Sequence, residues 1–137
     1  MLQTDQLARS LETLRYSLRH FTESEPGSVE NEVFRNAVIK GFELSLETSA
    51  KLLRKRLADY VARPGSVHSL PFKEVFRRAA GFGILAPDAV ERWFKYRDNR
   101  NDTAHDYGER FAEETVRLLP AFLTDAESLL TTLQHEP

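Results

Sequence analysis

The longest helical pattern in the chain is FRNAVIKGFELSLETSAKLLRKRL, residues Phe34–Leu57. Apolar residues recur in it every three or four positions, so they form one stripe along a helix of about thirty residues. The members of the stripe are Phe34, Val38, Phe42, Leu46, Ala50, Leu53 and Leu57. Because a helix with one long apolar face is stable only when other helices cover that face, the rest of the chain has to supply them.

Four further helices are predicted by the same spacing. The first runs from about Thr4 to Thr22 and ends before a break at Glu25–Ser28. A short helix follows over Phe72–Ala80, and a fourth begins near Pro87. The last one carries Leu119, Phe122, Ala126, Leu129 and Leu133. No strand-like alternation appears, so we predict an all-α, up-and-down antiparallel bundle of about five helices.

Pro120 lies inside the last predicted helix. Proline lacks the N–H that would bond the carbonyl one turn earlier, so a kink or a break is expected there.

Composition limits the kind of protein that this chain can be. Its 137 residues suit one domain, residues 1–137, and the absence of cysteine excludes disulfide scaffolds and thiolate metal sites. No secretory signal and no apolar run of about 18 residues is present, so we expect a cytoplasmic protein. The net charge is −2, with 19 basic and 21 acidic residues mixed along the chain. Any contact with RNA must therefore come from a local site.

The segment YRDNRNDTAHDY, Tyr96–Tyr107, sets Arg100, His105 and Tyr107 at fixed spacing. Its polar residues, among them Asn101 and Asp102, favour turns and helix caps over helix interiors. We therefore expect the fourth helix to end near Arg100 and the last to begin near Thr103. A cap at Asp102 or Thr103 would place His105 in the first turn of the last helix, where free N–H groups suit a phosphate.

Arginine and histidine at that position indicate phosphate chemistry. Arg100 would stabilise negative charge with a planar fork of donors, and His105 would act as a general base. With no metal ligands evident, the pair fits cleavage of RNA by attack of the ribose 2′-hydroxyl on the adjacent phosphate. The alternative is structural: Arg100 forms ion pairs with neighbouring aspartates, Asp98, Asp102 or Asp106, that brace a helix junction, and His105 is a surface residue.

The bare spacing is not specific, because Arg15–His20 and Arg63–His68 repeat it. Only the third copy adds Asn101 and Tyr107, giving the pattern R-N-x-x-x-H-x-Y. In that form it resembles the signature of HEPN-domain proteins, specifically the HepT-like toxins and the related nucleotidyltransferase substrate-binding proteins.

Other segments extend the resemblance over roughly residues 4 to 133. Phe42–Glu47, followed by Lys51 and Leu53, resembles the second-helix signature of that family, and Phe72–Ala79 resembles its short middle helix. One departure is Ala50, where this family often carries a large aromatic residue, so packing around the second helix is expected to differ.

The resemblance implies a small helical bundle, commonly a homodimer, paired with a separate minimal nucleotidyltransferase in a toxin-antitoxin pair. In HepT-like members the arginine and histidine cleave RNA, and adenylylation of the motif tyrosine silences them. Carried over, these residues are Arg100, His105 and Tyr107, with Asn101 and Asp102 as further motif positions. For the substrate-binding relatives catalysis is not implied, so a non-catalytic binding subunit for RNA or a nucleotide is the second interpretation. No cofactor or metal is expected.

Two more groups of residues have open interpretations. Glu43 and Glu47 share one face of the second helix and either line a cleft or balance nearby lysines at the edge of the core. The basic residues Lys51, Arg54, Lys55 and Arg56 form either a solvated helix end or a surface for a partner or phosphate. Trp93 and Tyr96 have no evident partner within the chain, which favours a homodimer that buries them.

Overall fold

The computed structural model describes the backbone of residues 2–103 and 109–137, and all the regular structure in these ranges is helical. The α-helices are α1 (Asp5–Glu23), α2 (Val29–Leu57), α3 (Phe72–Gly81), α4 (Ala89–Thr103) and α5 (Glu109–Leu133). A 3₁₀ helix, η1 (Pro64–Ser69), stands in part of the segment between α2 and α3. The predicted all-α bundle is confirmed.

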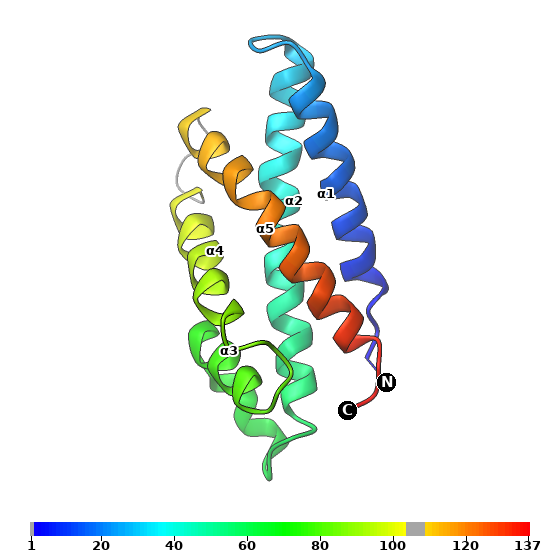
Figure 1. The fold of residues 1–137 in the computed structure, drawn as a ribbon, viewed down its shortest axis with the longest axis vertical. Helices are drawn as coiled ribbons and strands as arrows, with labels where there is room; N and C mark the ends of the chain where they lie inside the picture. The colour runs from blue at the N-terminus through cyan, green and yellow to red at the C-terminus, as the bar shows by residue number, and fades with distance from the viewer. Residues whose placement is uncertain (1, 104–108) are drawn as a thin grey trace.

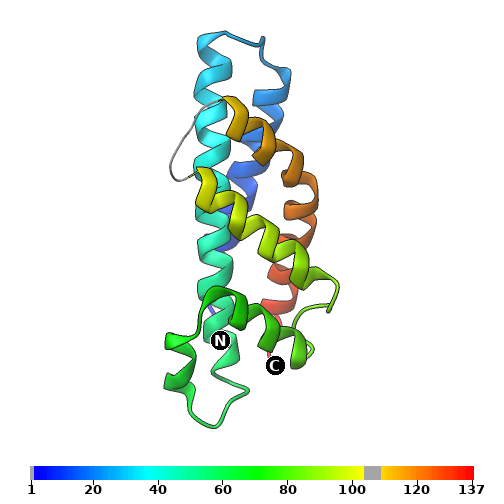
Figure 2. The same ribbon diagram turned by 90° about the vertical axis from the view of Figure 1, so that its left-hand side faces the viewer.

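Helix α2 is the axis of the bundle. Helix α1 runs antiparallel along it, and α4 and α5 form a second antiparallel pair that packs against it (Figure 1). The short α3 lies near the lower end, between α2 and α4. Both chain termini lie toward that end as well (Figures 1 and 2).

The turn between α1 and α2 forms where the sequence predicts a break. Gly27 has a φ of 85°, which a glycine adopts without strain, and Ser28 caps α2 by accepting a hydrogen bond from the backbone N–H of Asn31. Farther along, a Cβ atom placed on Gly41 would lie 3.2 Å from the Cδ1 atom of Leu14. The glycine therefore lets α1 approach α2 closely.

An aromatic cluster fills the core between α2, α3, α4 and α5. Trp93 stacks on Phe76, with ring centroids 4.9 Å apart, and Tyr96 meets Phe122 edge to face at 5.2 Å. Phe42 of α2 contacts Phe122 at 5.0 Å. Trp93 and Tyr96 are 0% and 1% exposed, so the expectation that they lack partners within the chain is wrong. Helices α3 and α5 cover them, and helical spacing on α4 alone could not reveal that cover.

A buried carboxylate joins α4 to α5 at the edge of this cluster. The Tyr96 hydroxyl donates to Asp125 Oδ2 at 2.6 Å, while Arg92 donates to both carboxylate oxygens at 2.8 and 2.9 Å. Burial, and then the hydrogen bond to Asp125, raise the pKa of Tyr96. The hydrogen bond to Asp125 raises the pKa of Arg92. The phenol and the guanidinium therefore keep their protons and remain donors.

Two predictions about helix continuity differ from the structure for the same reason. A kink or a break was predicted at Pro120; helix α5 continues through this residue, so the break is wrong, and the helix curves (Figure 2). Helix α4 continues through Thr103, so the predictions that it ends near Arg100, and that Asp102 or Thr103 caps the last helix, are also wrong. A poor helix former costs only a few tenths of a kcal/mol, and even proline roughly 3 kcal/mol, and core packing on both sides offsets these amounts.

In the described part of the chain, no helix is long and apolar enough to cross a membrane.

The contacts of Asp125 lead to a stability prediction. Asp125→Ala should lower the free energy of unfolding by about 2–3 kcal/mol, because it leaves the buried Tyr96 hydroxyl without its acceptor and removes two hydrogen bonds of Arg92, which keeps those to Asp88. Urea denaturation measures the change. The matched control is Glu127→Ala on the same helix, which removes an exposed carboxylate paired with Arg15 and should cost less than about 1 kcal/mol. Equal losses in the two variants would contradict the account.

Candidate functional site

Arg100 lies in the last turn of α4 and reaches across to α2. Its Nη2 atom donates to Glu47 Oε1 at 2.5 Å, and 29% of its side chain is exposed. The two residues are 53 positions apart in sequence. Asp98, one of the partners considered for Arg100, has its carboxylate 3.7 Å from Lys73 Nζ. The ion pair with Glu47 therefore links two helices, whereas Asp106 and the side chain of Asp102, the other partners considered, lie outside the described part of the chain.

A buried amide fixes the end of α4 next to Arg100. Asn99 Nδ2 donates to the hydroxyl of Thr115 in α5 at 2.9 Å, and both side chains are buried. A buried amide without a partner would cost free energy, so this bond favours one arrangement of the two helices. Sequence analysis missed the pair, because a single polar residue in a helix does not indicate its partner.

The other motif residues are described only in part. Asn101 and Asp102 belong to the last turn of α4. His105 and Tyr107 lie outside the described residues. His105 is five positions after Arg100, so the chain between them spans at most about 18 Å.

The two glutamates of α2 occupy different environments. Glu43 is buried, with 6% of its surface exposed, whereas the Glu47 side chain is 56% exposed and bonds Arg100. Glu47 also lines the cavity described next.

A cavity of about 160 Å³ opens between α2, α3 and α4, beside the Arg100–Glu47 pair. Figure 2 shows α4 lying across α2 in this region. The cavity is lined by Leu46, Glu47, Ala50, Lys51, Arg54, Phe72, Arg97 and Arg100. Two members of the predicted basic run, Lys51 and Arg54, thus face this cavity, whereas Lys55 and Arg56 line another near the termini. We call the cavity of about 160 Å³ the basic cavity.

The two other copies of the arginine–histidine spacing lie in other parts of the fold. His20 stacks on Phe34, with ring centroids 5.0 Å apart, and Arg15 pairs with Glu127. Arg63 precedes η1, and His68 lies in its last turn.

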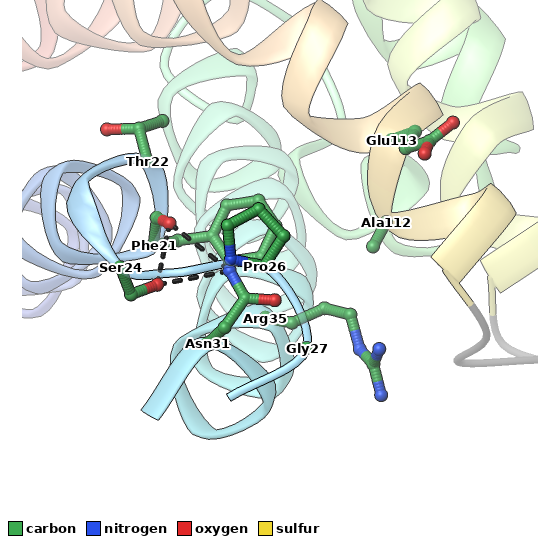
Figure 3. A pocket seen from close by; sticks show the side chains of 9 residues that line it. All are labelled: Phe21, Thr22, Ser24, Pro26, Gly27, Asn31, Arg35, Ala112 and Glu113. Carbon is green, nitrogen blue, oxygen red and sulfur yellow. Dashed lines mark hydrogen bonds between the residues drawn. The ribbon is translucent and has the colours of Figure 1, made fainter. Parts of the chain in front are cut away.

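A second cavity, of about 300 Å³, lies between the α1–α2 turn and the beginning of α5 (Figure 3). The amide of Asn31 donates to Ser24 Oγ at 3.0 Å and to the Phe21 carbonyl at 3.4 Å, so its polar atoms stabilise the turn. Figure 3 shows the Arg35 side chain extending away from the turn, with Glu113 on the other side of the hollow. Among the described residues, fewer cationic groups line this cavity than line the basic cavity.

Among the residues that the structure describes, no group of three or more His, Cys, Asp or Glu side chains could hold a metal ion.

Comparison with known proteins identifies the family. The model of the family described as "nucleotidyltransferase substrate binding protein like" matches residues 2–135. A "probable ribonuclease HepT" from Haemophilus influenzae (strain ATCC 51907 / DSM 11121 / KW20 / Rd) is 27% identical over 122 residues, which cover 89% of this chain and 82% of the relative.

A solved structure supports the same assignment at the level of the fold. It comes from Haemophilus influenzae and is described as the fold of a substrate binding domain of a nucleotidyltransferase. It superposes with a TM-score of 0.86 at 23% identity, over 97% of this chain and 100% of the other. The sequence match over nearly the whole length and the shared helical architecture lead to one conclusion: the chain belongs to the family of nucleotidyltransferase substrate-binding-like proteins.

Proposed function

We propose that this chain is a HepT-like, metal-independent ribonuclease, the toxin of a toxin-antitoxin pair whose partner is a separate minimal nucleotidyltransferase. Membership of the family supports the link to a nucleotidyltransferase, and the relative named "probable ribonuclease HepT" supports the activity. Residues 1–137 act as one domain in this proposal, because helices α1 to α5 share one hydrophobic core.

The position of Arg100 carries the proposal. Its guanidinium is partly exposed at the edge of a cavity that also contains Lys51, Arg54 and Arg97. Asn99 holds the same helical turn against α5. A positioned arginine among other cations suits a phosphate, and His105 follows within five residues.

The reaction needs one base and one group that stabilises charge. His105 takes the proton of a ribose 2′-hydroxyl, whose oxygen attacks the adjacent phosphorus, and Arg100 stabilises the charge that builds up on the phosphate oxygens. The bond from phosphorus to the 5′-oxygen then breaks. The leaving oxygen takes a proton from the imidazolium or from water. The products are a 2′,3′-cyclic phosphate and a 5′-hydroxyl.

Regulation and assembly follow from the HepT resemblance. Tyr107 is the proposed site of adenylylation by the partner, which would place a bulky anionic group two residues from His105. A homodimer remains part of the proposal, but Trp93 and Tyr96 do not support it because their own chain buries them.

A non-catalytic binding subunit is the second candidate. The ion pair with Glu47 favours it, since a carboxylate already occupies part of the Arg100 fork. In that case the site binds a nucleotide or RNA for the nucleotidyltransferase and cleaves nothing.

Mutation of the motif separates the two functions. His105→Ala should lower the rate of RNA cleavage by about 10²-fold or more, because it removes the general base. Arg100→Ala should have a similar effect, and Arg100→Lys should not restore activity, because a point charge cannot replace a planar fork. Cleavage and thermal melting should be measured on the same samples, and melting should change little.

The two other copies of the spacing supply the controls. Arg15→Ala and Arg63→Ala should cleave at the wild-type rate when folded. Unchanged cleavage by folded His105→Ala protein would end the ribonuclease proposal and favour the binding subunit.

Tyr107 is tested by intact mass. Co-production with the partner nucleotidyltransferase should add the mass of one or more adenylyl groups to the wild-type chain and none to Tyr107→Phe. Modification that persists in Tyr107→Phe protein would exclude this tyrosine as the acceptor.

A further inference from the structure

We infer that the basic cavity between α2, α3 and α4 is a phosphate subsite, which holds a nucleotide phosphate next to the one that Arg100 contacts. The inference rests on the proposed function in one respect: a nucleotide or RNA chain reaches Arg100. It adds a second point of attachment, made by Lys51, Arg54 and Arg97.

Local charge is the first argument. The lining carries four positive charges, on Lys51, Arg54, Arg97 and Arg100, and one negative charge, on Glu47. Its net charge is therefore +3, although the net charge of the whole chain is −2. Lys51, Arg54 and Arg97 have no carboxylate partner among the described residues. Like charges that gather around one hollow repel each other, so binding of an anion there relieves the repulsion.

The cationic groups are also held in position. Arg54 donates through Nη2 to the Leu70 carbonyl at 2.8 Å, and the Arg97 guanidinium lies over the Phe72 ring, 4.9 Å from its centroid. In addition, the Nε atom of Arg54 is buried with no acceptor among the described residues. Side chains that are already ordered lose less entropy when they bind a ligand. The lining thus favours a small, highly charged ligand.

The size of the cavity agrees with this ligand. About 160 Å³ leaves ample room for a phosphate group, since roughly 10–15 Å³ of such space already holds a water molecule. Ala50 lines the cavity with a single methyl group. A larger side chain at this position would project toward the same space.

The arrangement along α4 suggests how a chain would bind. Arg97 and Arg100 are three residues apart, so their Cβ atoms are neighbours on one helix face, about 5–6 Å apart. Consecutive phosphates of an extended strand can therefore each meet one arginine. Glu47, which is exposed, is the group that an incoming phosphate would displace from Arg100.

Binding measurements on protein that does not cleave test the subsite. In a His105→Ala background, binding of a labelled single-stranded oligouridylate is followed by fluorescence anisotropy across a salt series. Lys51→Gln and Arg97→Gln should each raise Kd by about fivefold to tenfold and make the dependence of log K on log salt shallower by about 0.7.

The matched control is Lys95→Gln. Lys95 is an exposed cation of α4, two residues before Arg97 and so about 200° around the helix. It should change neither Kd nor the salt dependence. If the Lys51 and Arg97 variants bind no more weakly than Lys95→Gln, the inference is wrong.

Ala50→Leu tests the location without changing charge. It should also weaken binding, because the larger side chain occupies the cavity, and melting shows whether the variant is folded. If folded Ala50→Leu protein binds with wild-type affinity, the phosphate does not bind in this cavity.

Adenosine triphosphate distinguishes the source of the phosphate. If the Lys51 and Arg97 variants weaken binding of oligouridylate only, the ligand is the RNA backbone; if they weaken both equally, it is a free nucleotide. Failure of the proposed function is seen separately, as RNA cleavage that survives His105→Ala. In that case binding of adenosine triphosphate still tests the subsite, because a free nucleotide has no RNA linkage to cleave.

Discussion

The contact between α4 and α5 is the constraint on which the candidate site depends. Residues 104–108 connect these two helices, and His105 and Tyr107 are among them. The described residues on either side of this segment hold the two helices together: Tyr96 and Arg92 bond Asp125 at the edge of the aromatic cluster, and Asn99 bonds Thr115 nearer the motif. The last turn of α4, which carries Arg100, therefore has little freedom to move relative to α5.

These polar bonds act together with apolar packing. The rings of Trp93, Tyr96 and Phe122 meet edge to face, and burial of large aromatic side chains contributes much of the stability of a small core. Hydrogen bonds of a buried amide and a buried carboxylate contribute less net free energy, but leaving them unmade is costly, so they select one register of the two helices. Apolar packing thus provides most of the stability, and the polar bonds fix the position of α4 relative to α5.

The long amphipathic helices were predictable from sequence, because burial of one face repeats over many turns. The stripe from Phe34 to Leu57 predicted α2 (Val29–Leu57) well, and the break at Glu25–Ser28 was also found. The boundary after Arg100 was not predictable in this way. Caps and turns favoured by Asn and Asp differ from helix by tenths of a kcal/mol, and contacts to α5, far along the sequence, outweigh them.

The candidate site was predictable only one segment at a time. The motif drew attention to Arg100, and the basic run drew attention to Lys51 and Arg54, but the spacing in neither segment indicates that they line one cavity. The bond from Arg100 to Glu47 joins residues 53 positions apart, and Arg97 comes to the same hollow from α4. Trp93 and Tyr96 show the same limit, since the helices that cover them are separate in sequence.

The most direct test of the account is the chemistry of RNA cleavage itself. A defined RNA, and the same RNA with a 2′-O-methyl group at the cleaved position, should be incubated with the protein in the presence of a chelator, and the products analysed by mass spectrometry. The account predicts 2′,3′-cyclic phosphate and 5′-hydroxyl ends from the first RNA and no cleavage at the methylated position of the second. Cleavage at the methylated position, or products with 3′-hydroxyl ends, would contradict it, because the 2′-oxygen would then not be the nucleophile.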